Sequence, residues 1–189
     1  TVSKTDGLVK RGATLLKEVK DAPLNADVIF SMVGYPKDVE EVYLGENGLI
    51  KTAKEGQVFV DMTTSSPTLA KKISEEFAKV GAAALDLPVT GGDIGAKNGT
   101  LSIMAGGDKK VFEETVLPLV KNFGKNITYF GEAGKGQYTK LANQIAIATT
   151  MISVAESFKF AKEVGLNLDD FFNIVSTGSG GSFSMTSYG

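Results

Sequence analysis

The sequence predicts an α/β fold, with a doubly wound and mostly parallel sheet that is followed by helices alone. Between residues 26 and 130, short apolar runs of strand length alternate with helical patterns. The apolar runs are continuous, which is typical of strands covered on both faces, as in parallel sheets. From Gly134 onward the pattern is purely helical. Strands that alternate with helices indicate a parallel sheet with helices on its faces.

Turn residues and helix caps separate the predicted elements. Pro36 lies near the first position of one helix, and Asn167 is a plausible cap of another. A brief strand over residues 14–16 and a long glycine-rich loop over residues 87–100 complete the pattern. The predicted strands are residues 26–33, 57–62, 82–86, 101–105 and 127–130. The predicted helices are residues 3–11 (capped by Ser3), 37–43, 68–80, 108–122, a long helix from Gly134, and 168–176.

Composition excludes several kinds of chemistry. The 189 residues contain no cysteine and no histidine, and the net charge is −2. Disulfides, thiolate or histidine metal sites and Ser-His-Asp catalysis are therefore excluded, and we expect no metal site. Without a basic stripe, nucleic acid is not an expected partner. Acid–base chemistry must use Lys, Tyr, Asp or Glu.

We expect a cytoplasmic protein without a membrane segment. The first residues are polar and lack the apolar core of a signal peptide. The most apolar long run, residues 145–160, is interrupted by polar residues and is shorter than the roughly 20 residues that a membrane span needs. The sequence begins with Thr1, so we expect a piece of a longer protein.

The glycine turn and helix that begin at Gly134 are the first candidate site. Lys140, Asn143 and Gln144 fall at i, i+3 and i+4 and project from one helix face. Together they could hold a small oxyanion or a carbonyl, and two glycines could let a ligand approach closely. On this stretch alone, a surface lysine on a solvated helix is the simpler interpretation.

Polar loops follow several predicted strands. The hydroxyls of residues 61–67 could contact a cofactor or merely cap a helix, through Ser65 or Ser66. Residues 88–92 could cradle a carboxylate or phosphate with backbone N–H groups, or form a flexible surface loop. Ligands of parallel sheets bind at the carboxyl ends of strands. We therefore expect these loops, the turn after Phe130 and Lys140 to converge on one crevice.

Four ordered motifs resemble the β-hydroxyacid dehydrogenase family, which includes 3-hydroxyisobutyrate dehydrogenases and tartronate semialdehyde reductases. Residues 61–67 resemble its D-x-S/T-T-x-x-P segment, and residues 86–101 resemble its substrate signature D-x-P-V-S-G-G-x-x-G-A-x-x-G-T-L. Residues 134–144 resemble its catalytic signature, and residues 181–184 its G-S-W-S segment, with Phe183 for Trp. The resemblance covers essentially the whole chain.

The resemblance implies a Rossmann-like dinucleotide-binding domain over residues 1–133 and the start of a helical domain over residues 134–189. Lys140 would be the general acid–base residue, which requires a lowered pKa or a cation beside the developing alkoxide. Asn143 would orient the substrate beside it. The other implied contacts are Thr90, Gly91, Gly92, Asn143 and Gln144 to the substrate, and Met32, Val33, Gly34 and Thr64 to the cofactor.

The chain also departs from the family pattern. The glycine fingerprint G-x-G-x-x-G is absent, since Gly131, Gly134 and Gly136 have the wrong spacing, and we expect the N-terminal βαβ unit that carries it to be missing. The family continues past residue 189 with further helices. Thr90 replaces the usual serine. The absence of histidine disfavours 6-phosphogluconate dehydrogenases.

The resemblance implies an NAD(P)-dependent oxidoreductase that moves hydride between the cofactor and a small 3-hydroxy acid or its semialdehyde. Thr1, Ser3 and Lys4 give a slight preference for NADP over NAD. An apolar stripe on the long helix predicts burial against later helices or a homo-oligomer formed through the helical domain. The alternatives are a non-catalytic carboxylate-binding module and a phosphate-binding domain of the same fold.

Overall fold

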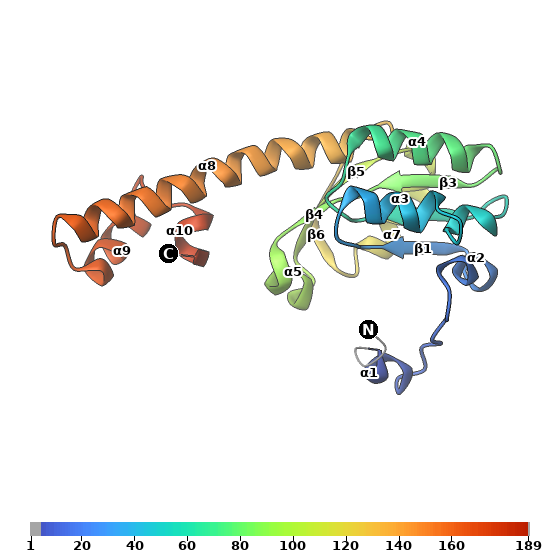
Figure 1. The fold of residues 1–189 in the computed structure, drawn as a ribbon, viewed down its shortest axis with the longest axis horizontal. Coiled ribbons are helices and arrows are strands. Elements are labelled where there is room, and N and C mark those ends of the chain that lie inside the picture. Colours follow the sequence, from blue (N-terminus) through green and yellow to red (C-terminus); the bar gives the residue numbers. More distant parts are fainter. Residues whose placement is uncertain (1–4, 189) are drawn as a thin grey trace. The chain divides into compact units, whose positions relative to one another are not determined.

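Six strands form one sheet in a computed structural model that describes residues 5–188 (Figure 1). Their order is β1-β2-β3-β5-β4, with β6 beside β5. The strands are β1 (Val28–Ser31), β2 (Val58–Asp61), β3 (Ala83–Asp86), β4 (Val89–Thr90), β5 (Leu101–Gly106) and β6 (Gly124–Gly131). The first three strands are parallel and in simple register, with Val58 opposite both Val28 and Ala83. The predicted α/β sheet is confirmed.

Two strands of the sheet, β5 and β6, run opposite to β1, β2 and β3. β5 and β6 are parallel to each other, whereas β5 is antiparallel to β3 and β4. Asp86 at the end of β3 is paired with Gly106 at the end of β5. This offset brings the carboxyl ends of the two groups of strands together. The carboxyl ends of β2, β3, β5 and β6 meet as expected, through an offset antiparallel pair. Thr90 instead pairs with Ser102 near the start of β5, so the single crevice that would include residues 88–92 stays a prediction.

Helices cover both faces of the sheet, as Figure 1 shows. Along β2, Val58 and Val60 face one core with Phe112 and Val120, while Phe59 faces the other. α3 (Pro36–Leu44) and α4 (Pro67–Ala78) cover the Phe59 face. The opposite face is covered by α6 (Lys109–Val111), a π-helical turn (Phe112–Val116) and α7 (Leu117–Val120). Side chains that alternate between two apolar cores explain the continuous apolar runs of the sequence.

Several predicted elements need correction. Residues 14–16 form no strand, and the predicted loop 87–100 contains β4 and the helix α5 (Gly92–Asn98). The predicted helix 108–122 is interrupted by the π-helical turn. The first helix is only α1 (Asp6–Val9), and its predicted cap Ser3 lies outside the described residues. The remaining short elements are the 3₁₀ turns Val19–Asp21 and Leu49–Lys51 and the helix α2 (Ala22–Asn25).

The chain divides into two compact units, one that reaches Lys140 and one that begins at Leu141. The second unit contains most of α8 (Lys135–Glu163), together with α9 (Leu168–Ser176) and α10 (Phe183–Tyr188). As predicted, Asn167 caps α9, because its side chain accepts a hydrogen bond from the Asp170 N–H at 3.0 Å. The predicted domain boundary between residues 133 and 134 stays a prediction. No helix in residues 5–188 is long and apolar enough to span a membrane.

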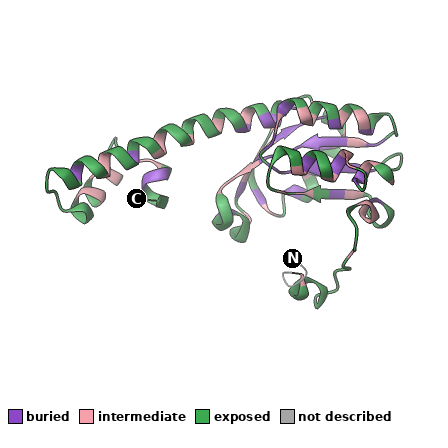
Figure 2. Cartoon of the chain, viewed as in Figure 1, coloured by how far each residue is buried: buried purple, intermediate pink, exposed green. Residues whose placement is uncertain are grey.

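The interior of the second unit is small. Phe158 of α8 contacts Phe171 of α9 edge to face, with ring centroids 5.2 Å apart. The hydroxyl groups of Thr150 and Ser184 lie 2.7 Å apart and join α8 to α10. Figure 2 shows that most of this unit is exposed. Ile145 and Ile152, from the predicted apolar stripe, are 72% and 60% exposed.

Candidate active site

The start of α8 is held by a buried carboxylate at the end of β3. Asp86 Oδ1 accepts a hydrogen bond from the Gly134 N–H at 2.7 Å, and Oδ2 accepts one from the Gln137 N–H at 2.8 Å. These bonds satisfy two backbone N–H groups that a helix start leaves unpaired. Burial raises the pKa of Asp86 to about 6, and the two N–H groups oppose that rise. Asp86 therefore fixes where α8 begins.

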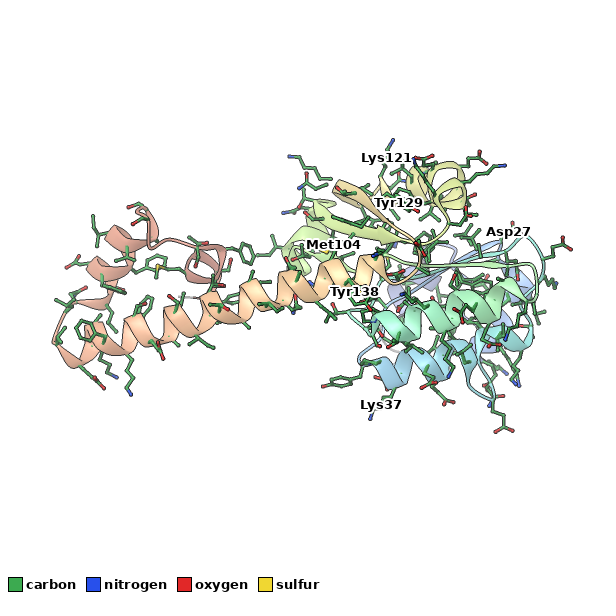
Figure 3. All side chains as sticks on the ribbon, turned by 90° about the horizontal axis from the view of Figure 1, so that it is seen from above. Asp27, Lys37, Met104, Lys121, Tyr129 and Tyr138 are labelled. Carbon is green, nitrogen blue, oxygen red and sulfur yellow. The ribbon has the colours of Figure 1, made fainter. Side chains whose placement is uncertain are left out.

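The two glycines of the turn allow the helix to approach the sheet closely. Gly134 has a φ of +89°, which other residues rarely adopt. A Cβ atom on Gly136 would collide with the backbone carbonyl oxygens of Asp86 and Met104. In Figure 3, Met104 lies on β5 and Tyr138 on the first turns of α8. The sequence had suggested that a ligand could approach this glycine closely. The space around Gly136 is filled instead by the chain's own backbone.

The side-chain amide of Gln137 ties the loop after β2 to α8. It is completely buried. Its Nε2 donates to the Thr63 carbonyl oxygen at 2.7 Å, and its Oε1 accepts from the Ser65 N–H at 2.8 Å. Both ends of the amide are therefore used, and residues 63–65 are fixed to the first turn of a helix more than 70 residues later. Thr64, between the two bonded residues, is exposed.

A second buried carboxylate ties the end of β1 to the end of β2. Asp61 Oδ1 accepts hydrogen bonds at 3.1 Å from the Ser31 hydroxyl and from the Thr63 N–H. The Thr63 hydroxyl accepts in turn from the Val33 N–H at 2.9 Å. Burial raises the pKa of Asp61 above its ordinary value. The loops after β1 and β2 and the start of α8 consequently form one hydrogen-bonded cluster.

Lys140 lies one turn beyond Gln137 on the same helix and is only 6% exposed. Within residues 5–188 its amine has no hydrogen-bond or ion-pair partner. Burial lowers the pKa of Lys140 below its ordinary value, because desolvation penalises the ammonium form. A surface lysine is thus ruled out. A buried lysine whose amine has no partner and a lowered pKa is a functional-site candidate.

The other predicted site residues lie at three places. Met32, Gly34 and Thr64 are exposed at the ends of β1 and β2, and Val33 is half-buried there. Thr90 is half-buried at the end of β4, and Gly91 and Gly92 follow it with φ values of +123° and +62°. In the second unit, the Asn143 amide donates to Gln144 Oε1 at 3.0 Å. No hydrogen bond among the described side chains joins Thr90 to the cluster at Gln137.

Sequence reasoning missed the importance of Asp86 and Gln137. Both lie inside quoted motifs, but no role was given to either. A carboxylate directly after an apolar strand and a glutamine directly after a glycine turn were the available signals. Their connection could not be read from the sequence, since residues about 50 positions apart meet only when the sheet forms.

The exposed groups at the ends of β1 and β2 fit a nicotinamide dinucleotide. Met32 and Tyr35 are 69% and 68% exposed, which offers apolar surface to a flat ring. Thr64 is an exposed residue of the neighbouring loop, as a ribose or amide contact requires. Ser65 Oγ is buried and is the one buried side-chain polar atom without a hydrogen-bond partner in the described part of the chain. A donor set of hydroxyls and apolar side chains suits such a ligand.

Comparison with known proteins identifies the class. A family model described as the NAD binding domain of 6-phosphogluconate dehydrogenase matches residues 1–131. A second, described as the NAD-binding domain of NADP-dependent 3-hydroxyisobutyrate dehydrogenase, matches residues 134–189. The chain belongs to the β-hydroxyacid dehydrogenase family, as its motifs had predicted, and its Rossmann-like sheet is that of this family.

The relatives are longer than this chain. An uncharacterized oxidoreductase of Bacillus subtilis, YkwC, is 51% identical over 98% of the chain and 64% of its own length. A probable 3-hydroxyisobutyrate dehydrogenase-like protein of Arabidopsis thaliana is 42% identical over the whole chain and 56% of its own length. The solved structure of Psf3 in complex with NADP+ and 2-OPP is 27% identical, with a TM-score of 0.90 over 98% of this chain and 66% of its own. The chain thus spans less than two thirds of each.

Proposed function

We propose that the protein is an NAD(P)-dependent oxidoreductase that transfers hydride between the nicotinamide and a small 3-hydroxy acid or its semialdehyde. The observation that carries the proposal is the unpaired amine of the buried residue Lys140, one turn beyond Gln137, whose N–H group Asp86 holds. Membership of the β-hydroxyacid dehydrogenase family supports the reaction class.

When bound, the nicotinamide supplies or accepts the hydride. Lys140 donates a proton to the carbonyl oxygen during reduction and takes the hydroxyl proton during oxidation. Its lowered pKa increases the fraction of neutral amine that can act as a base near neutral pH. In the ammonium form, the same group stabilises negative charge that develops on the substrate oxygen.

Substrate and cofactor contacts are assigned from the motifs. We assign the substrate carboxylate to Thr90, Gly91 and Gly92, because the positive φ values of the glycines leave a backbone without side-chain obstruction. Asn143 and Gln144 follow Lys140 on α8 and would orient the substrate. Met32, Val33, Gly34 and Thr64 would contact the cofactor.

Cofactor choice and association are further parts of the proposal. The NADP complex of Psf3 supports a phosphorylated cofactor, while Thr1, Ser3 and Lys4, which suggested it here, lie outside the described residues. The exposed Ile145 and Ile152 of α8 support burial against further helices or a second copy.

Replacing Lys140 tests the proposed function. In the full-length protein, Lys140→Met should lower turnover of a 3-hydroxy acid roughly 10²- to 10⁴-fold, as loss of an acid–base group does. The matched control is Lys135→Met, which removes an exposed lysine from the first turn of the same helix. Nucleotide affinity, measured by nicotinamide fluorescence, should stay the same in both variants. Equal turnover in the two variants would contradict the assignment.

The wild-type protein separates the alternatives. A carboxylate-binding module would bind hydroxy acids without producing reduced cofactor. A phosphate-binding domain would bind phosphate esters and leave nicotinamide fluorescence unchanged. Turnover of at least one small 3-hydroxy acid favours the oxidoreductase over both.

A further inference from the structure

We infer that Gln137 is a positioning residue that makes the loop of residues 62–66 and Lys140 move as one body. The inference rests on the proposed function, because the loop carries Thr64, which we assign to the cofactor, and Lys140 carries the reacting proton. Nothing in the motifs alone distinguishes Gln137 from its neighbours on the helix.

The first step is the geometry of the Gln137 amide. It donates to Thr63 and accepts from Ser65, so it bonds to the residues on both sides of Thr64. Its own backbone N–H is held by Asp86 at 2.8 Å. Because the side chain is completely buried, water cannot replace either amide bond at low cost. The position of Thr64 therefore depends on the position of this helical turn.

The second step is the rigidity of the helix. Residues three apart are neighbours on one face of a helix, so Lys140 occupies the next position after Gln137 on the same face of α8. The axial position of this turn is fixed by Asp86 and by the backbone that surrounds Gly136. The Gln137 amide therefore sets where the loop lies relative to the Lys140 amine, one turn further along the helix. An error of about 1 Å in such a group can cost about 100-fold in rate.

A second buried glutamine offers a matched control. Gln57 lies at the other end of β2, is 7% exposed, and donates to the Pro23 and Ala26 carbonyl oxygens at 2.6 and 2.8 Å. Its Oε1 accepts from the Lys54 N–H at 2.7 Å. We assign no ligand contact near Gln57. Loss of its amide should therefore affect folding and leave the site unchanged.

The experiment compares Gln137→Met with Gln57→Met in the full-length protein. Methionine keeps the length of the side chain and removes the amide bonds. Both variants should unfold at a lower temperature than the wild type. Only Gln137→Met should also lower kcat/KM, roughly 10- to 100-fold, and raise the KM for the nucleotide. Loss of a purely structural residue would reduce the fraction of active enzyme and would leave the KM for the nucleotide and the KM for the hydroxy acid unchanged.

The pKa of Lys140 gives a readout that does not need turnover. The rate at which acetic anhydride modifies Lys140, followed against pH by mass spectrometry of its peptide, reports this pKa. In Gln137→Met, the amine should lose part of its burial, and its pKa should rise towards the ordinary value of a lysine. In Gln57→Met it should stay as in the wild type.

The outcomes separate the two proposals. If the wild type turns over no hydroxy acid, the proposed function fails, and the Lys140 pKa alone decides the role of Gln137. If kinetics and Lys140 pKa are the same in Gln137→Met and Gln57→Met, the positioning role is overturned. If Gln137→Met does not fold, Gln137→Glu replaces it. The introduced carboxyl can accept from Ser65 but, when ionised, cannot donate to Thr63, so the same kinetic and pKa changes are expected, and their absence overturns the role.

Discussion

The two ends of β2 are held in similar ways but differ in what they leave unpaired. At the amino end, the buried amide of Gln57 bonds to backbone within about 34 residues of it, and every buried polar side-chain atom there has a partner. At the carboxyl end, the buried amide of Gln137 bonds to backbone 72 and 74 residues away. Beside it, Ser65 Oγ and the Lys140 amine have no partner among the described residues.

This difference shows which feature indicates function. A buried amide with all its hydrogen bonds is present at both ends, so it indicates only a well-made structure. Raised carboxyl pKa values, an unpaired buried hydroxyl and a buried lysine with an unpaired amine occur at the carboxyl end, where the family motifs lie. Buried groups without partners are costly, and a protein retains them where a ligand or a reaction uses them.

The largest effect on stability should come from a methyl group at the carboxyl end. Gly136→Ala should lower the free energy of unfolding by about 3 kcal/mol or more, because its Cβ would collide with two backbone carbonyl oxygens that cannot rotate away. At the amino end, Gly56→Ala meets no atom within 4 Å and should cost only about 1 kcal/mol, the strain of its φ of +83°. Urea unfolding measures both. Similar values would show that α8 is not seated against Asp86 and Met104 as described.

The next effect is a dependence of stability on pH that arises from Asp86. Its pKa is about 6 in the folded protein and 3.8 in the unfolded chain. The folded state therefore binds the proton more tightly, so this group stabilises the fold below pH 4, and its contribution is lost as pH rises towards 6. The loss is about 3 kcal/mol.

Comparison of the wild type with Asp86→Asn separates the pH-dependent contribution of Asp86 to stability from the contributions of other titrating groups. The stability of the wild type relative to Asp86→Asn should be greatest near pH 4 and should shrink by pH 7. Asp27→Asn, which replaces an exposed carboxylate at the amino end of β1, is the control. Unfolding free energies measured at several pH values test this. Parallel curves for the wild type and Asp86→Asn would refute the raised pKa.

The smallest effect should come from the unpaired hydroxyl. Ser65→Ala should change stability by less than about 1 kcal/mol, and could increase it, because no hydrogen bond is lost and a buried polar atom is removed. Ser31→Ala should cost about 1 kcal/mol or more, since the Ser31 hydroxyl donates to Asp61 and bonds to Tyr43. Thermal unfolding compares the two. A large loss of stability in Ser65→Ala would reveal a partner for this hydroxyl.

The sequence predicted the positions of the strands well and their directions less well. The strands at Val58 and Leu101 were expected from continuous apolar runs, which both cores require. The antiparallel direction of β5 was not expected, because a buried strand has the same apolar pattern whichever way it runs. Helix α5 was predicted as loop, since four glycines within residues 91–99 obscure its periodicity.

The candidate site shows the same division. Lys140 was found because its spacing from Asn143 and from Gly134 matches a family motif. Its burial could not be predicted, because lone lysines are mostly exposed and only the surrounding fold excludes water. Gln137 was not singled out, since its partners Thr63 and Ser65 lie more than 70 residues away.

The sequence by itself determined the family, the order of the elements and the residues that can carry acid–base chemistry in a chain without histidine. These follow from residue types and local spacing, which need no knowledge of distant contacts. Only the tertiary structure decided that Asp86 holds the start of α8, that Gly136 faces backbone, and that Lys140 is a buried residue whose amine has no partner among the described residues. The first two depend on the offset of β3 against β5, which places Asp86 and β5 side by side at the start of α8.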